Sequence, residues 1–384
     1  MPTLTQNMVA ESAALIPELV TGFMADEDGN ADPFVKAFPL ADRDAWKVQW
    51  DQRESAYGLT PQGSLDAPPE LMVAPGVRVY DVEPGVYRGY TQINETELVR
   101  SREPGTISDP LDVGDRLATV MIYIGEWIAP RIFKIFADLG VNGYFNNQSL
   151  NGVQHTYKIN GYQRLSMSAW AGAPTTATPI DDLRVAANTL NRGTSSRFGS
   201  KSKLCMTDEA ITTLLATTQV RSTFKSEYGA SFLAPFDNAN RNGPQPPLNG
   251  DRSLNSLFIG MGLPEIVPWN RGYYPLLSDV QNRTKGNFTK FLGNTSAVWL
   301  GSRPGGQQLG QFTFARHAGH LLGPKADFDV PSIKAPGSAT EFGKNIYLAA
   351  HVRNRQPHGY DFEWGFNCTP EVWYEDAMAA VYWS

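Results

Sequence analysis

Four histidines and one cysteine in the last quarter of the chain are the residues best suited by type to metal chemistry. His317 and His320 stand three positions apart, His351 and His358 follow, and Cys368 supplies a thiol. A zinc site needs several imidazoles or thiolates that converge on one point. The His-Ala-Gly-His spacing matches none of the standard zinc patterns, and its glycine favours a loop. We therefore expect ordinary packed or surface histidines, with no metal site and no cofactor.

Three adjacent acid pairs could suggest acid–base chemistry: Asp181-Asp182, Asp208-Glu209 and Glu375-Asp376. Neighbouring residues on a helix point in different directions, so such a pair does not form a catalytic dyad. The first two pairs fit helix N-termini, where the helix dipole favours negative charge. The chain also lacks a nucleophile elbow and a phosphate-binding glycine loop. We predict that the protein is not an enzyme.

The composition indicates a mixed α+β protein with two lobes. A chain of 384 residues exceeds the roughly 250–300 residues that one hydrophobic core usually serves. Its 35 glycines and 27 prolines favour many turns, and its net charge of −6 argues against a surface dedicated to nucleic acid. Two cysteines do not make a disulfide framework. With no secretory leader and no apolar run long enough for a bilayer, we expect a soluble, intracellular protein without a membrane partner.

Residues 49–105 contain many glycines and prolines and few residues that could form a core. Within them, residues 77–80 and 86–90 predict a hairpin closed by a type II turn at Pro84-Gly85. A projecting hairpin without a core must bury its surface on another molecule, which indicates assembly. Tyrosine and arginine are enriched at protein interfaces. The candidate subunit-interface residues are Trp50, Arg53, Tyr57, Arg78, Tyr80, Tyr87, Arg88 and Tyr90.

The strongest helical pattern covers residues 109–140. Asp109 and Pro110 fit the cap and first helical position, Gly140 fits the end, and Pro130 should kink or split the helix. Apolar residues recur every three or four positions, which predicts one buried face. Its members are Leu117, Met121, Ile124, Ile128, Ile132, Ile135 and Leu139.

The rest of the chain alternates short predicted elements. We expect a helix over residues 9–20 in an N-terminal arm that needs a neighbour to order it. Turn signals predict a strand pair within 141–168, and caps at Thr178 and Thr207 predict two helices. A long loop over 228–256 and strands at 257–260, 297–301 and 312–315 should follow. The aromatic stretch 345–384 should close a sheet.

This order of segments resembles the major capsid proteins of tailed bacteriophages, which have the Hong Kong 97-like fold, and the lambda-like branch is the nearest comparison. The most specific stretches are Tyr57-Gly58 with Asp66-Ala67-Pro68, Asn94-Glu95-Thr96-Glu97, Ala169-Trp170 with Asp181-Asp182-Leu183, and Gly272-Tyr273-Tyr274 with Thr289-Lys290-Phe291-Leu292 and Val298-Trp299-Leu300. The resemblance implies an N-terminal arm (1–48), an extended hairpin loop (49–105), a peripheral domain with a spine helix (106–170), an axial domain (171–334) and a return to the peripheral domain (335–384).

The resemblance also implies a function and partners. Such proteins form hexamers and pentamers that tile an icosahedral shell around phage double-stranded DNA, which they contact non-specifically. The location would be the virion, after assembly in the host cytoplasm. Because only about 48 residues precede the loop, we expect a separate scaffolding protein, together with a portal and a decoration or cement protein where one is used. An encapsulin-like compartment, or a carbohydrate-binding or carbohydrate-active β protein, are the alternatives.

Part of this family joins subunits by lysine–asparagine isopeptide bonds that need a lysine on the extended loop. Between Val48 and Gly105 the sequence has five arginines and no lysine. A guanidinium stays protonated at cellular pH and cannot replace a lysine amine as nucleophile. We therefore expect a shell without these crosslinks.

Overall fold

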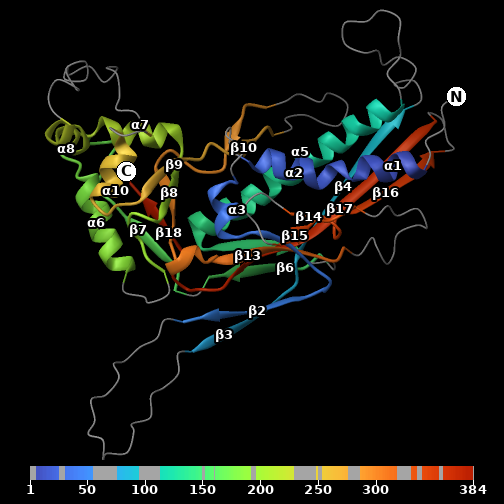
Figure 1. The fold of residues 1–384 in the computed structure, drawn as a ribbon, viewed down its shortest axis with the longest axis horizontal. Coiled ribbons are helices and arrows are strands. Elements are labelled where there is room, and N and C mark those ends of the chain that lie inside the picture. The colour runs from blue at the N-terminus through green and yellow to red at the C-terminus, as the bar shows by residue number, and fades with distance from the viewer. Residues whose placement is uncertain are drawn as a thin grey trace, which may run out of the picture.

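Two five-stranded sheets, each bordering its own hydrophobic core, organise the chain (Figure 1). The computed structural model describes residues 6–25, 31–54, 76–94, 113–148, 152–159, 161–191, 196–228, 248–249, 253–275, 286–317, 330–334, 340–353 and 358–383. The first sheet has the order β1-β13-β17-β16, and β4 also pairs with β17. Its strands are β1 (Leu40–Arg43), β4 (Gly85–Asn94), β13 (Gly310–Ala315), β16 (Tyr347–Arg353) and β17 (Gly359–Val372).

The second sheet has the order β7-β18-β12-β8-β9. Its strands are β7 (Gln163–Ser166), β8 (Lys203–Met206), β9 (Glu265–Pro268), β12 (Ser296–Leu300) and β18 (Met378–Tyr382). The helices beside it, at the left of Figure 1, are α6 (Pro179–Leu190), α7 (Asp208–Ala216), α8 (Thr218–Tyr228) and α10 (Leu254–Gly260). The chain crosses between the sheets more than once, because β12 and β18 lie in the second sheet whereas β13 and β17, between them in the sequence, lie in the first.

The long helix α5 (Val113–Asn142) carries the main core. All seven residues of the predicted apolar face are buried, with exposed fractions of 0–4%, so that prediction is confirmed. The helix runs through Pro130 as one element and is not split. It ends at Asn142 rather than at Gly140, and the next residue, Gly143, has φ of +73° and donates its N–H to Leu139 O at 2.8 Å. The predicted cap at Asp109 lies outside the described residues.

Gly140 has another use, since it lets α5 approach the second sheet. A Cβ at this position would lie 2.7 Å from a methyl carbon of Val298 on β12. Any larger residue would therefore push the helix away from the sheet that borders the other core.

The N-terminal segment packs on its own subunit, which corrects the expectation that it needs a neighbour. It forms α1 (Gln6–Ala13), α2 (Leu15–Met24) and α3 (Pro33–Ala37). Ile16 and Val20 of α2 are fully buried in the main core, and the Cβ of Leu19 lies 3.0 Å from where a Cβ on Gly125 of α5 would be. Figure 1 shows α1 and α2 lying along α5.

Asp32 joins this segment to the chain after β9. It accepts hydrogen bonds from the Phe34 N–H, as the cap of α3, and from Trp269 Nε1, both at 2.9 Å. Arg271 lies 3.4 Å from the same carboxylate and donates to Phe23 O and Ala25 O at the end of α2. Burial raises the pKa of Asp32 to about 6, against the lowering effect of Arg271.

This pKa predicts that Asp32 contributes stability to the folded protein on acidification. The folded-state pKa of Asp32 lies above the usual 3.8, so the folded chain binds the proton more tightly than the unfolded chain. The contribution grows as pH falls through about 6 and is complete below about 3.8. Between pH 7.5 and 5 it should add about 1 kcal/mol to the unfolding free energy. Denaturant titrations at pH 7.5 and pH 5 measure this change in unfolding free energy. The change should be larger by that amount in wild type than in Asp32→Asn, and an identical change in both proteins would contradict the assignment.

Several shorter predictions are confirmed and two are wrong, one of them the cap at Thr178, whose side chain makes no cap hydrogen bond at the start of α6. The strand pair within 141–168 is β5 (Tyr144–Gln148) with β6 (Gln154–Lys158), and Gly152 between them has φ of +76°. Thr207 caps α7 by accepting from the Ala210 N–H. Residues 257–260 belong to α10 rather than a strand, because Ser253 caps a helix there. The remaining elements are β10 (Gly272–Tyr273), β11 (Thr289–Lys290), β14 (Ile333–Lys334), β15 (Glu341–Phe342) and the short helix η2 (Pro304–Gly306).

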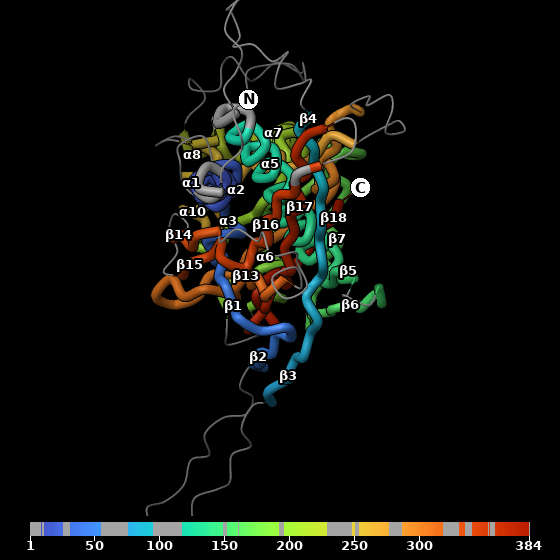
Figure 2. The backbone as a smooth tube through the Cα atoms, turned by 90° about the vertical axis from the view of Figure 1, so that its right-hand side faces the viewer, coloured from blue at the N-terminus to red at the C-terminus, as the bar shows by residue number. Residues whose placement is uncertain are grey.

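The predicted hairpin within 77–90 does not form. Instead β3 (Val77–Val82) pairs antiparallel with β2 (Val48–Arg53), while β4 pairs with β17. Gly85 lacks the positive φ that a type II turn requires at this position, so Pro84-Gly85 connects strands in two different sheets. Figure 2 shows the β2–β3 pair extending away from the body of the subunit. We call this pair the ribbon.

No helix in the described part of the chain is both long and apolar enough to span a membrane.

Candidate functional site

The two faces of the ribbon have different surroundings. Along β2 the side chains alternate, so Val48, Trp50 and Gln52 are buried and the intervening residues are exposed. This period of two is that of a strand with one face on a core. The ribbon therefore has an inner face, which attaches it to the subunit, and an outer face, which the subunit leaves open.

Aromatic rings attach the inner face. Trp50 stacks on Tyr80 with ring centroids 5.3 Å apart, and both rings contact the edge of Tyr157 on β6, at 5.2 and 5.0 Å. Trp50 Nε1 donates to Val372 O at 3.1 Å, and the Tyr80 hydroxyl donates to Gln52 Oε1 at 2.9 Å. Burial raises the pKa of Tyr157 well above its usual value. Trp50 and Tyr80 thus pack against the rest of the chain, and their role as interface residues stays a prediction.

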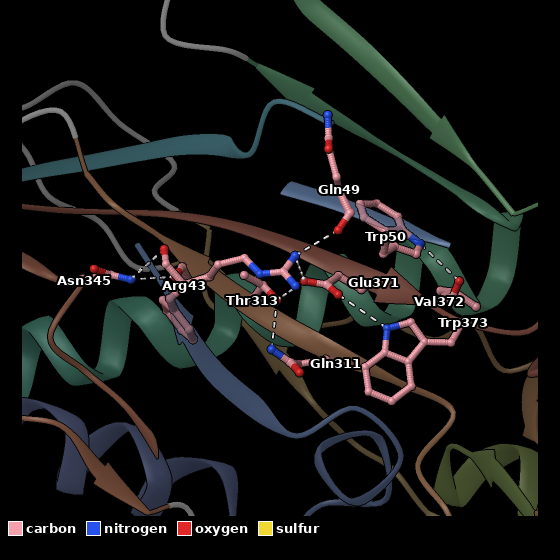
Figure 3. Close-up of polar contacts among 10 residues, drawn as sticks. Arg43, Gln49, Trp50, Gln311, Thr313, Asn345, Glu371, Val372 and Trp373 are labelled. Carbon is pink, nitrogen blue, oxygen red and sulfur yellow. Dashed lines mark hydrogen bonds and ion pairs between the residues drawn. The ribbon is translucent and has the colours of Figure 1, made fainter. Parts of the chain in front are cut away.

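Glu371 on β17 is the polar centre of the attachment (Figure 3). Its side chain is 2% exposed. Its carboxylate accepts hydrogen bonds from Arg43 Nη1 at 3.4 Å, from Trp373 Nε1 at 3.4 Å and from the Thr313 hydroxyl. Arg43 also donates to Gln49 O on β2 at 3.0 Å, so its guanidinium links the ribbon backbone to the buried carboxylate. A buried charge needs such partners, and removing one of them would be costly.

The other predicted interface residues fall into three groups. Tyr87 stacks on Phe366 at 5.1 Å, and burial raises its pKa, so it too is a packing residue. Arg53, Arg78, Arg88 and Tyr90 are exposed, and Arg88 forms an ion pair with Glu363. Tyr57 lies outside the described residues. The exposed group stays a prediction as subunit contacts.

A pocket of about 390 Å³ opens between the ribbon and β6. Its walls carry charges of both signs, including Arg78, Asp81, Glu83 and Lys158. Glu83 lies 3.6 Å from Lys47, whose charge partly balances its own, and 3.8 Å from His155. The pocket therefore belongs to the place where the ribbon attaches to β6.

The residues considered for metal or acid–base chemistry have other surroundings. Within the described ranges, no group of three or more His, Cys, Asp or Glu could hold a metal ion. His317 is buried and stacks on Tyr347 at 5.3 Å, and burial raises the pKa of the Cys368 thiol. Asp182 accepts hydrogen bonds from Trp170 Nε1 at 2.9 Å and from the Ser168 N–H at 3.1 Å. That carboxylate therefore links the first turn of α6 to Ser168 and Trp170 in the segment before it.

Sequence reasoning missed Glu371 and Tyr157. Both lie far along the chain from the ribbon and belong to no motif. Glu371 did carry one signal, since it is a lone acid between apolar and aromatic residues in a strand-prone stretch. Such a charge must be paired if the strand is buried.

No protein-family model and no curated protein sequence matches the chain. Among solved structures, a protein assigned as a prophage capsid protein from E. coli CFT073 matches with a TM-score of 0.57 at 12% identity, covering 100% of both chains. A phage-related protein from Bordetella bronchiseptica RB50 matches at 0.47 and 9%, covering 100% of this chain and 98% of that one. The capsid of cyanophage P-SCSP1u matches at 0.48 and 10%, covering 92% and 89%.

The first of these matches carries the assignment of fold. The chain has the α+β, Hong Kong 97-like fold of phage capsid proteins, as the order of its segments predicted. At such low identity the likeness concerns fold alone.

Proposed function

We propose that the chain is a major capsid protein that assembles as hexamers and pentamers into an icosahedral shell around phage double-stranded DNA. The observation that carries the proposal is the capsid fold along the whole chain, shared with the prophage protein from E. coli CFT073. The ribbon supports it, because this two-stranded pair extends from the body and leaves one of its faces open for a neighbouring copy. Its place would be the virion capsid, after assembly in the host cytoplasm.

The five segments keep their proposed roles in this account. Residues 1–48 and 49–105 are the arm and the extended loop, 106–170 and 335–384 form most of the peripheral domain, and 171–334 form most of the axial domain. A scaffolding protein, a portal and a decoration or cement protein are the proposed partners, and DNA is contacted without sequence preference.

Sedimentation and negative-stain microscopy of the purified protein test this proposal. We expect closed shells in addition to free subunits. Shells that protect double-stranded DNA from nuclease after expression with the other phage proteins would favour a capsid over an encapsulin-like compartment. A protein that stays monomeric at every concentration, with a melting temperature raised by sugars, would contradict the shell and favour carbohydrate binding.

The shell should contain no isopeptide ladder. The 49–105 segment lacks lysine, so its contacts must be noncovalent: ribbon contacts, Arg–carboxylate pairs or a separate cement protein. Denaturing electrophoresis of mature particles should give a single band near 42 kDa, the mass of the chain. Covalent multimers that survive heat and reductant would overturn this prediction.

A further inference from the structure

The second sheet is a wall between the two hydrophobic cores. Val298 of its central strand β12 belongs to the main core, whereas the next residue, Trp299, belongs to the other core, as the alternation of side chains along a strand requires. We call the part around the main core the first lobe and the part around the other core the second lobe. The C-terminal end of α5 in the first lobe touches this wall where Gly140 leaves no room for a side chain beside Val298.

Two tyrosine hydroxyls hold this end of α5. The last carbonyls of a helix have no partner within the helix and need donors from elsewhere. The Tyr162 hydroxyl donates to Gly140 O, and the Tyr382 hydroxyl donates to Val141 O. Tyr382 ends β18, and Tyr162 directly precedes β7, the strand that pairs with β18 at the edge of the second sheet. The second lobe thus supplies the donors for the last turn of a helix of the first lobe. We call Tyr162 and Tyr382 the tyrosine clamp.

The surroundings of the tyrosine clamp keep both rings in place. Gly143 follows α5 directly, and a Cβ there would overlap the ring of Tyr162. The guanidinium carbon of Arg164 lies over the ring of Tyr382, 4.9 Å from its centroid. Burial raises the pKa of Tyr162 well above its usual value, so its hydroxyl stays protonated and remains a donor. Hydrogen bonds are directional, so these two favour one orientation of the helix end, which the apolar contact at Val298 does not select by itself.

We infer that the tyrosine clamp fixes the angle between the two lobes and that this angle sets the curvature of the assembled shell. Tyr162 and Tyr382 are positioning residues, because they act through α5. The rotation between neighbouring copies decides whether and where an assembly closes. A subunit that bends at the joint between its lobes presents its contact surfaces at varying angles, so its shells vary in size. The angle is a property of the subunit, while its consequence for the shell rests on the proposed function.

Removal of both hydroxyls tests the angle directly. The free subunit carries spin labels at Ile122→Cys on α5 and Val185→Cys on α6, positions that are 37% and 65% exposed. Both native cysteines are fully buried and stay unlabelled. Pulsed electron paramagnetic resonance then measures the distribution of distances between the two lobes. We expect one narrow peak in the otherwise wild-type subunit. This peak should be lost, in favour of a broad distribution, when Tyr162→Phe and Tyr382→Phe are added.

The matched control is Tyr273→Phe with Tyr274→Phe, because both side chains are exposed and the change leaves the tyrosine clamp intact. This control should keep the narrow peak. A peak that stays equally narrow without the clamp hydroxyls, or that broadens equally in the control, would overturn the inference. If the double clamp variant does not fold, Tyr382→Phe alone takes its place and is judged by the same two outcomes.

Shells assembled from the unlabelled proteins test the consequence for curvature. Electron microscopy should show one shell diameter for wild type and for the control, and several diameters or open shells for the clamp variant. A broad distance distribution together with shells of one diameter would overturn the role of the clamp in curvature. A wild-type protein that forms no shells contradicts the proposed function instead, and the distance measurement then still decides whether the clamp fixes the angle.

Discussion

Replacing Ile128 with alanine is expected to lower the unfolding free energy of the subunit by about 2–5 kcal/mol. Ile128 is fully buried at the middle of α5, where it belongs to the main core. Its removal leaves a cavity that the first sheet and the N-terminal helices can fill only in part. A loss of this size is a large fraction of the stability of an ordinary domain, so shells should also fail to form.

The matched control is Ile122→Ala on the same helix, where the side chain is 37% exposed. Chemical denaturation of the unassembled subunits should show a near-normal unfolding free energy for this control. Similar losses in the two variants, or normal stability in Ile128→Ala, would mean that the buried face of α5 is assigned wrongly.

Replacing Trp50 with alanine is expected to release the ribbon from the subunit. The change removes the ring that stacks on Tyr80 and meets Tyr157 edge-on, and it removes the hydrogen bond from Nε1 to Val372 O. Truncating a buried Trp typically costs about 3–5 kcal/mol. The stabilisation that is lost concerns the attachment of the ribbon. Hydrogen exchange should therefore accelerate in β2 and β3 while α5 stays protected. Shell yield should fall sharply.

Trp46→Ala is the control for this variant, because Trp46 lies just before β2 and is 41% exposed. It should leave exchange in the ribbon near the wild-type rate. The account of the attachment is wrong if Trp50→Ala leaves exchange in β2 and β3 unchanged. It is also wrong if exchange accelerates equally in both variants.

Local chemistry in the sequence predicted α5 and its buried face. Apolar residues recur with the helical period between Leu117 and Leu139, and each of these positions is buried. An apolar stripe along one side of a helix packs against the core, so the pattern identifies the buried side. The Thr207 cap and the turn at Gly152 were predictable for the same reason, since each depends on residues within a few positions.

Strand pairing was not predictable in the same way. Residues 77–90 contain turn residues between two strand-like runs, and a hairpin was the simplest interpretation. The structure pairs β3 with β2 and β4 with β17, about 275 positions away, and this choice depends on surfaces that only the folded sheet creates. The same holds for Trp50, whose partners Tyr157 and Val372 come from distant strands. Tyrosine and tryptophan are common in both cores and interfaces, so their type alone could not separate the two roles.

A three-dimensional reconstruction of purified particles by electron cryomicroscopy tests the central claim most directly. The account predicts a closed icosahedral shell in which this chain forms rings of five and six, with α5 and the ribbon placed in each subunit as in Figures 1 and 2. A protein that yields only monomers or open aggregates, or shells whose subunits have another fold, would contradict it.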